Sequence, residues 1–235
     1  MREQPEQQAP PVQRLRIRYA KRGRLRFTSH RDFSRAFERA VFRARVPMAY
    51  SSGFNPHPRI SYAGAAPTGS ASEAEYVEIA LAEVVDPAAV QALLSESLPD
   101  GLDVLAVAEA TSTSLADLLQ ASRWLIDVPA EPARVEAAVA AFLAADEVLV
   151  ERMTKKGMRT FDSRAAVRQM SAGPGERGAR IDVLLVHGTP SVRPDDVLTA
   201  LRQVAADDLD VDGVLLTRAS QGPLLEDGTI GDPFA

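Results

Sequence analysis

Basic side chains gather in the first quarter of the chain. Between residues 14 and 59 there are 13 Lys or Arg, and the acids are Asp32 and Glu38. Because arginine forks bind phosphate oxygens bidentately, this segment is typical of a surface that meets a polyanion. We predict a nucleic-acid or other phosphate partner. A solvated face, an acidic protein and the chain's own acidic half are the alternatives. The charged binding residues predicted here are Arg16, Arg18, Lys21, Arg22, Arg24, Arg26, Arg31, Arg35, Arg39, Arg43 and Arg59.

Of the three histidines in the chain, His30 and His57 fall inside this basic segment. Ser29 and Asp32 form a capping-box pattern, which places His30 in the first turn of a helix. Exposed N–H groups and the dipole of that turn favour an anion and disfavour a charged imidazole. His30 is therefore the candidate catalytic base, whereas Ser29 either binds the anion or simply caps the helix.

The segment from Ser51 to Arg59 is rich in Gly, Pro and Asn and predicts a loop. Phe54 offers an aromatic face for stacking a base, or it packs the loop onto the core. The binding residues predicted in this loop, besides Arg59, are Ser52, Gly53, Phe54, Asn55 and His57.

A smaller basic cluster lies in the second half of the chain. Lys155, Lys156 and Arg159 surround Gly157, which could bring backbone N–H groups to a phosphate. The alternative is an ordinary basic hairpin tip. No His, Asp or Glu spacing resembles a metal motif, so no metal site is predicted.

The elements that would position these residues follow a recurring order. Residues 14–19 alternate Arg with Leu, Ile or Tyr, which predicts a strand with one apolar face. A helix follows Ser29 and is ended by Pro47, strands follow at 60–63 and 76–81, a helix at 87–98 and a strand at 102–107. Residues 25–27 are expected to form a short hairpin arm.

The same order is predicted again in the second half. Strands are expected at 124–128, 148–153, 181–186 and 211–216, and helices at 132–144 and 193–206, with a loop at 173–178. The fold class is therefore α+β, with two tandem ferredoxin-like (βαββαβ) units that have antiparallel sheets. The predicted divisions are a disordered leader (1–12), a first unit (13–108), a linker (109–122), a second unit (123–220) and a C-terminal tail (221–235).

Charge and composition limit the possible functions. Residues 1–62 carry a net charge of +10 and the other 173 carry −15, which together give the formal −5. The absence of cysteine excludes disulfides, thiolate zinc sites, iron–sulfur clusters and cysteine nucleophiles. No apolar run approaches the ~18 residues of a membrane span, and the N-terminus is polar. We expect a cytoplasmic protein without membrane contact.

The run Gly-Phe-Asn-Pro-His-Pro-Arg-Ile-Ser at 53–61 resembles the radical-SAM-linked family of unknown function. Residues 26–32, 69–76 and 155–157 are also similar to that family, and the resemblance covers about 14–220. Arg31 departs from the family, in which a hydrophobic residue is common. Family members occur alone or fused to the C-terminus of a radical SAM enzyme. The resemblance implies an accessory protein whose iron–sulfur cluster and S-adenosylmethionine belong to a partner enzyme, with no cofactor in this chain.

Three functions compete on these grounds. The first is an accessory protein that holds RNA, such as tRNA, on its basic face for a separate radical SAM enzyme. The second is a metal-independent endoribonuclease. In it His30 takes the proton of a ribose 2′-OH, and Arg31 or Lys155 stabilises the phosphorane. It rests on a fold-level likeness to the repeat-associated endoribonucleases of CRISPR systems. The third is a subunit that docks an acidic protein.

Overall fold

The computed structural model describes residues 7–154, 157–205 and 209–235. The chain divides into two compact units, the first made of Met1–Leu118 with Phe234–Ala235 and the second of Leu119–Pro233. Both combine α-helices with antiparallel strands, which agrees with the predicted α+β class. Within the described ranges, no helix is long and apolar enough to cross a membrane. Residues 1–6 of the predicted leader lie outside the described residues.

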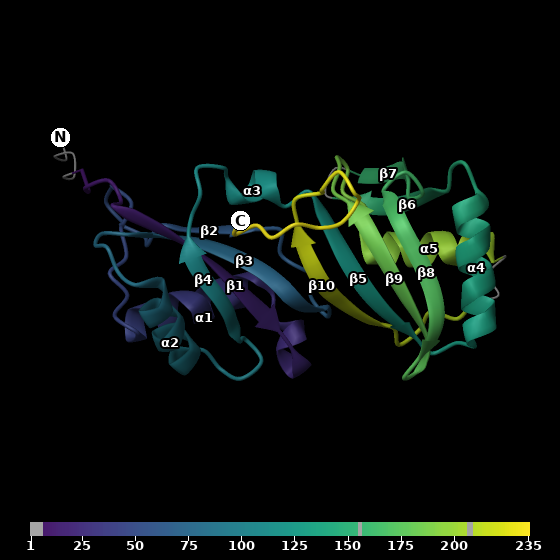
Figure 1. The fold of residues 1–235 in the computed structure, drawn as a ribbon, viewed down its shortest axis with the longest axis horizontal. Helices are drawn as coiled ribbons and strands as arrows, with labels where there is room; N and C mark the ends of the chain where they lie inside the picture. Colours follow the sequence, from purple (N-terminus) through teal and green to yellow (C-terminus); the bar gives the residue numbers. More distant parts are fainter. Residues whose placement is uncertain (1–6, 155–156, 206–208) are drawn as a thin grey trace. The chain divides into compact units, whose positions relative to one another are not determined.

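The first unit has an antiparallel sheet. Its elements are β1 (Gln13–Lys21), η1 (Gly23–Phe27), α1 (His30–Arg43), β2 (Ile60–Ala63), β3 (Ala71–Leu81), α2 (Pro87–Ser97), β4 (Val104–Glu109) and α3 (Leu115–Leu118). β1 pairs with β3 and β4, and β2 pairs with β3. The strand order is therefore β4-β1-β3-β2 (Figure 1).

The alternation along β1 directs its apolar side chains to one face of that sheet. Leu15, Ile17 and Tyr19 join one core cluster with the buried faces of α1 and α2, so both helices cover the same face. The ring of Phe33 stacks on Tyr19 with centroids 4.3 Å apart. The arginines between these residues must consequently lie on the other face, away from the helices.

Two boundaries in the first unit differ from the prediction. Residues 25–27 form part of the 3₁₀ helix η1 instead of a hairpin arm, because Leu25 and Thr28 donate backbone hydrogen bonds within the segment. α1 ends at Arg43 before Pro47 is reached, and Arg45 has a φ of +52°, a left-handed conformation that cannot continue a helix.

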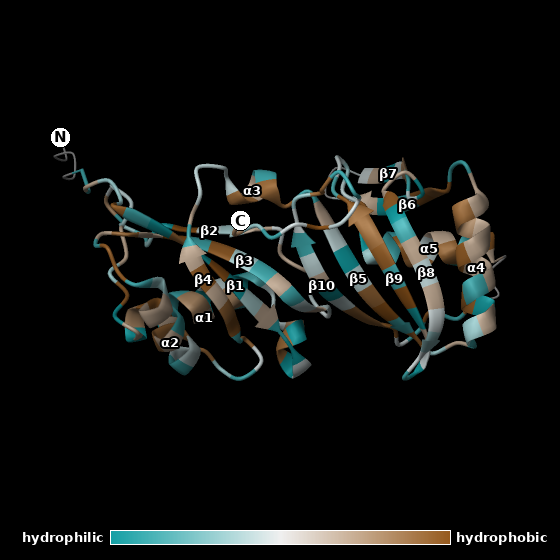
Figure 2. Ribbon diagram, viewed as in Figure 1, coloured by the Kyte–Doolittle hydropathy of each residue, from teal (hydrophilic) through white to brown (hydrophobic). Residues whose placement is uncertain are grey.

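The second unit also has an antiparallel sheet, in the order β10-β5-β9-β8. Its elements are β5 (Ala121–Val128), α4 (Pro132–Ala144), β6 (Leu149–Thr154), β7 (Gly157–Asp162), β8 (Val167–Gly175), β9 (Gly178–Val186), α5 (Pro194–Val204) and β10 (Leu215–Gly222). β9, which lies between β5 and β8, is hydrophobic along most of its length (Figure 2). Helices α4 and α5 pack against each other, and α4 packs on β8 and β9.

The strand predicted at 148–153 exists as β6 but does not join this sheet. It pairs with β7 in a separate hairpin, and β8 takes the place beside β9. β8 escaped prediction because it contains Pro174 and two glycines, which are tolerated on an edge strand but conceal its pattern. The predicted loop at 173–178 is a tight β8–β9 hairpin. The last strand lies at 215–222 instead of 211–216, so β10 includes residues 221 and 222 of the predicted tail.

Candidate nucleic-acid interface

α1 carries a row of exposed arginines. Ser29 caps this helix, because its hydroxyl accepts the Asp32 amide at 3.2 Å and donates to the Asp32 carboxylate at 2.7 Å. The capping interpretation of Ser29 is confirmed. The four arginines that follow the cap at every fourth position are all exposed: Arg31, Arg35, Arg39 and Arg43.

On an ordinary solvated face, charged side chains of both signs pair with one another, but most of these arginines do not pair with a described residue. Among the described residues, none forms an ion pair or hydrogen bond with the guanidinium of Arg31, Arg35 or Arg39. Arg43 donates to the Ser97 carbonyl at the end of α2. Three guanidinium groups on one helix are therefore available for external phosphate oxygens.

A broad groove of about 770 Å³ lies beside this row. It runs from the later turns of α1 to the end of α2, and Glu38 is its acidic wall residue. Phe42 lines the groove and is 81% exposed. Besides Ala36 and Glu38, the groove is lined by Arg35, Arg39, Phe42, Arg43, Ser97 and Pro99. An exposed ring among arginines can stack a base while the arginines hold the backbone.

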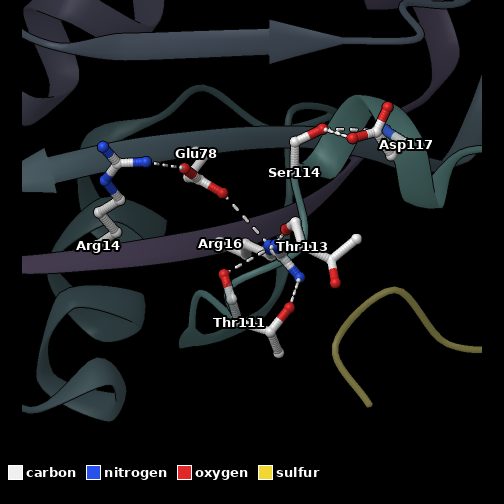
Figure 3. A network of polar contacts seen from close by, with 7 residues as sticks. All are labelled: Arg14, Arg16, Glu78, Thr111, Thr113, Ser114 and Asp117. Carbon is white, nitrogen blue, oxygen red and sulfur yellow. Dashed lines mark hydrogen bonds and ion pairs between the residues drawn. The ribbon is translucent and has the colours of Figure 1, made fainter.

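The arginines of β1 do not belong to this surface, although the sequence groups them with the α1 arginines as predicted binding residues. Arg16 is fully buried, where it bonds Glu78 at 3.3 Å and the Thr111 hydroxyl at 3.0 Å (Figure 3). Arg18 is half-buried and donates to the Glu73 carbonyl at 2.9 Å. The strand arginines lie on the sheet face opposite α1 because residues alternate sides along a strand.

The turn after β1 is also partly engaged in internal contacts. Lys21 is 4% exposed, and its ammonium lies 3.4 Å and 3.3 Å from the Ala66 and Pro67 carbonyls. Arg22 pairs with Glu73 and Asp103, and the hydrogen bond to Glu73 is the largest cause that raises its pKa. Buried Lys21 is a structural residue, not the exposed ligand that its position suggested.

The other arginines of this turn reach solvent to different degrees. Arg24 is exposed, and Arg26 lies over the ring of Phe27 at 4.6 Å. Both remain compatible with a phosphate contact.

The predicted loop is the tip of a hairpin. Tyr50 and Pro58 form an antiparallel bridge, and Gly53 at the tip has a φ of +126°, which only glycine adopts readily. Phe54 is 65% exposed, so it does not pack the loop onto the core. The predicted binding residues Ser52, Asn55, His57 and Arg59 are also exposed. The Ser52 hydroxyl accepts the Gln8 amide at 2.9 Å.

His30 opens α1 and is exposed. Its ring lies edge-on to Tyr62 at a centroid distance of 5.0 Å, and its Nδ1 is 3.4 Å from the Ser34 hydroxyl. Burial raises the pKa of Tyr62. No group of three or more His, Asp or Glu within the described parts of the chain is arranged to hold a metal. The exposed imidazole of His30 can therefore form a hydrogen bond with a ligand.

Of the basic cluster in the second half, Gly157 and Arg159 lie on β7, whereas Lys155 and Lys156 lie outside the described residues. Arg159 is exposed on β7 opposite Arg152, and Gly157 has a φ of +108°. Arg152 is held by the Asp196 carboxylate, whose own pKa is raised by burial. The cluster thus belongs to the second unit.

Two relevant residues escaped sequence reasoning. Phe42 lies outside the apolar face of α1 that Phe33 and Phe37 define, and an aromatic side chain off that face was the available signal. Glu78 stands between Val77 and Ile79 in β3, and a carboxylate inside an apolar strand was likewise visible in the sequence.

Comparison with known proteins identifies a family. The model of the family described as "Uncharacterized protein conserved in bacteria (DUF2344)" matches residues 14–211. No curated protein matches the chain.

Proposed function

The chain belongs to this family of uncharacterized bacterial proteins, and we propose that it is an RNA-binding accessory protein of a separate radical SAM enzyme. The α1 arginines and the groove beside them would hold the RNA. The observation that carries the proposal is the row of exposed α1 arginines, which form no ion pair with any residue that the structure describes, next to exposed Phe42.

When an RNA strand binds such a row, the arginines replace its condensed counterions, which are released into solution. This release gives a sequence-independent and salt-sensitive free energy of binding. Phe42 adds a stacking platform for an unpaired base, worth about 1–3 kcal/mol for each stacked base. A helix that presents both features suits a structured RNA with a splayed-out nucleotide.

The role beside a radical SAM enzyme rests on the motif resemblance. The motif at 53–61 and the residues around His30 support it, and the chain has no cysteine with which to ligate an iron–sulfur cluster. The cluster and the S-adenosylmethionine would belong to the partner, and this chain would supply the RNA contact.

We also infer that both units have the ferredoxin-like arrangement. The strand order β4-β1-β3-β2 in the first unit and the equivalent order β10-β5-β9-β8 in the second support this inference. The β6–β7 hairpin would then be an insertion between α4 and β8 of the second unit.

The test compares two charge-reversal variants that change the net charge equally. Arg35→Glu/Arg39→Glu alters the α1 row, and Arg168→Glu/Arg177→Glu alters exposed arginines of the second unit. Binding of bulk tRNA and of a short single-stranded oligoribonucleotide is measured at several salt concentrations. We expect the α1 variant to lose binding and the control to keep it. Unchanged binding by the α1 variant in low salt would refute the proposal.

The same preparations separate the competing functions. Cleavage of RNA by the wild type that His30→Ala abolishes would indicate an endoribonuclease instead. Anaerobic affinity purification after nuclease treatment tests the partner. An iron–sulfur enzyme among the retained proteins supports the proposed role. Retention of an acidic protein alone, without RNA, would favour a docking subunit.

A further inference from the structure

A second hollow lies on the first unit, beside the hairpin that carries the 53–61 motif. It has a volume of about 400 Å³ and shares no lining residue with the groove on α1. Glu78, which lines it, points to the sheet face that the helices leave free, because its neighbours Val77 and Ile79 belong to the helical core. The polar and charged residues of its lining are Arg14, Ser51, His57, Arg59, Ser61 and Glu78.

The hairpin side of the hollow is fixed by its own hydrogen bonds. The Ser51 amide donates to the His57 carbonyl at 2.9 Å, and the His57 amide donates to the Ser51 hydroxyl at 3.0 Å. The Nε of Arg59 donates to the Tyr50 carbonyl at 3.2 Å, which orients the guanidinium and leaves its terminal nitrogens for another acceptor. The donors on this side are therefore held in place before a ligand arrives.

The sheet side is fixed by a row of three charged residues. Buried Arg16 bonds one oxygen of Glu78 at 3.3 Å, and Arg14 lies 3.6 Å from the other oxygen (Figure 3). Arg16, which does not line the hollow, thus fixes the Glu78 carboxylate, and that carboxylate in turn positions Arg14 in the lining. The Arg14 side chain is 61% exposed, so most of its donors still face solvent.

The balance of charge in the hollow favours an anion. The lining has two guanidinium groups, Arg14 and Arg59, against one carboxylate, Glu78, and Arg16 already pairs with that carboxylate. Two serine hydroxyls add neutral donors. Guanidinium, imidazole and hydroxyl donors from separate directions match the three terminal oxygens of a phosphate better than the two coplanar oxygens of a carboxylate.

We propose that this hollow binds a phosphate monoester, with the phosphate held by Arg14, His57 and Arg59. A volume of about 400 Å³ falls within the range of small-ligand sites and leaves room for the organic group of the ester. The ester is either a free sugar phosphate or the phosphorylated end of an RNA. The site uses other residues than the RNA-binding row and does not depend on the proposed function.

The test is calorimetric titration of the full chain with ribose 5-phosphate, inorganic phosphate, and a diribonucleotide with or without a 5′-phosphate. Arg14→Gln and Arg59→Gln should each weaken binding of ribose 5-phosphate about tenfold or more, the factor expected for a lost charge-assisted hydrogen bond. Ser61→Phe should block the hollow without removing a charge. Arg168→Gln, in the second unit, is the matched control and should bind as the wild type does.

The outcomes distinguish the two sources of the phosphate, and they also test whether the site exists. Tighter binding of the 5′-phosphorylated diribonucleotide would identify an RNA end as the source of the phosphate, and tighter binding of ribose 5-phosphate would identify a free ester. Both results support the site. No binding of either ribose 5-phosphate or the 5′-phosphorylated diribonucleotide, or equally tight binding by Arg59→Gln and the wild type, would overturn it. Loss of binding in Arg35→Glu/Arg39→Glu but not in Arg14→Gln would also overturn it, because the phosphate would then sit on α1.

Discussion

Glu78→Gln is the most informative single change in the first unit. Arg16 is fully buried, and the Glu78 carboxylate is its charge partner in the network around β1 (Figure 3). The amide of the variant keeps nearly the same shape but removes the negative charge. A buried guanidinium then loses its counter-charge, which is the costly way to break a buried pair.

The magnitude follows from burial and from the contacts that remain. Removing one partner of a buried pair costs about 3–5 kcal/mol. Arg16 keeps its bond to the Thr111 hydroxyl at 3.0 Å and its contact with the Thr113 carbonyl, and the Glu78 side chain is 14% exposed. We therefore expect the lower end, a loss of about 3 kcal/mol in the free energy of unfolding. Arg14→Gln, at an exposed partner of the same carboxylate, should cost less than about 1 kcal/mol.

Urea unfolding followed by far-UV circular dichroism measures these losses. With an m-value of about 1–3 kcal/mol/M, the midpoint for Glu78→Gln should fall by about 1–3 M. The only tryptophan, Trp124, lies buried in the second unit, so its fluorescence follows that unit in the same samples.

The double variant Arg16→Met/Glu78→Gln should recover at least about 1 kcal/mol relative to Glu78→Gln, because it buries no charge. Equal stability of Glu78→Gln and Arg14→Gln, or no recovery in the double variant, would refute this reasoning.

Three further outcomes are expected. Burial lowers the pKa of His187 below its ordinary 6.5, so the unfolded chain takes up a proton first as the pH falls. The free energy of unfolding should therefore decrease below about pH 6.5, and thermal melts of His187→Gln should lack that part of the pH dependence. Ser29→Ala should destabilise α1 by about 0.5–2 kcal/mol, as measured by urea unfolding, whereas Ser112→Ala in an exposed bend should not. If phosphates contact the α1 row, Arg35→Gln/Arg39→Gln should reduce the salt slope of RNA binding by about 2; an unchanged slope would contradict those contacts.

Much of the first unit followed from local signals. The Ser29 cap, the 3.6-residue apolar period after it and the alternation along β1 predicted α1 and β1 because side-chain direction is set by the local backbone. Proline is common at the first position of a helix, so Pro132 indicated where α4 begins, and the predicted limits of 132–144 agree with the structure. β8 was missed because an edge strand tolerates proline and glycine and so carries no clear period.

For the candidate sites, the residue types alone show that basic side chains concentrate in residues 14–59 and that the first helix carries arginines at every fourth position. They do not show which of these side chains are buried. The folded chain buries Arg16 and Lys21 and leaves Arg31, Arg35 and Arg39 exposed. This difference arises because exposure depends on which chain segments pack over a strand. Arg16 is covered by residues around Thr111, 95 positions away, and no local pattern specifies a contact of that range.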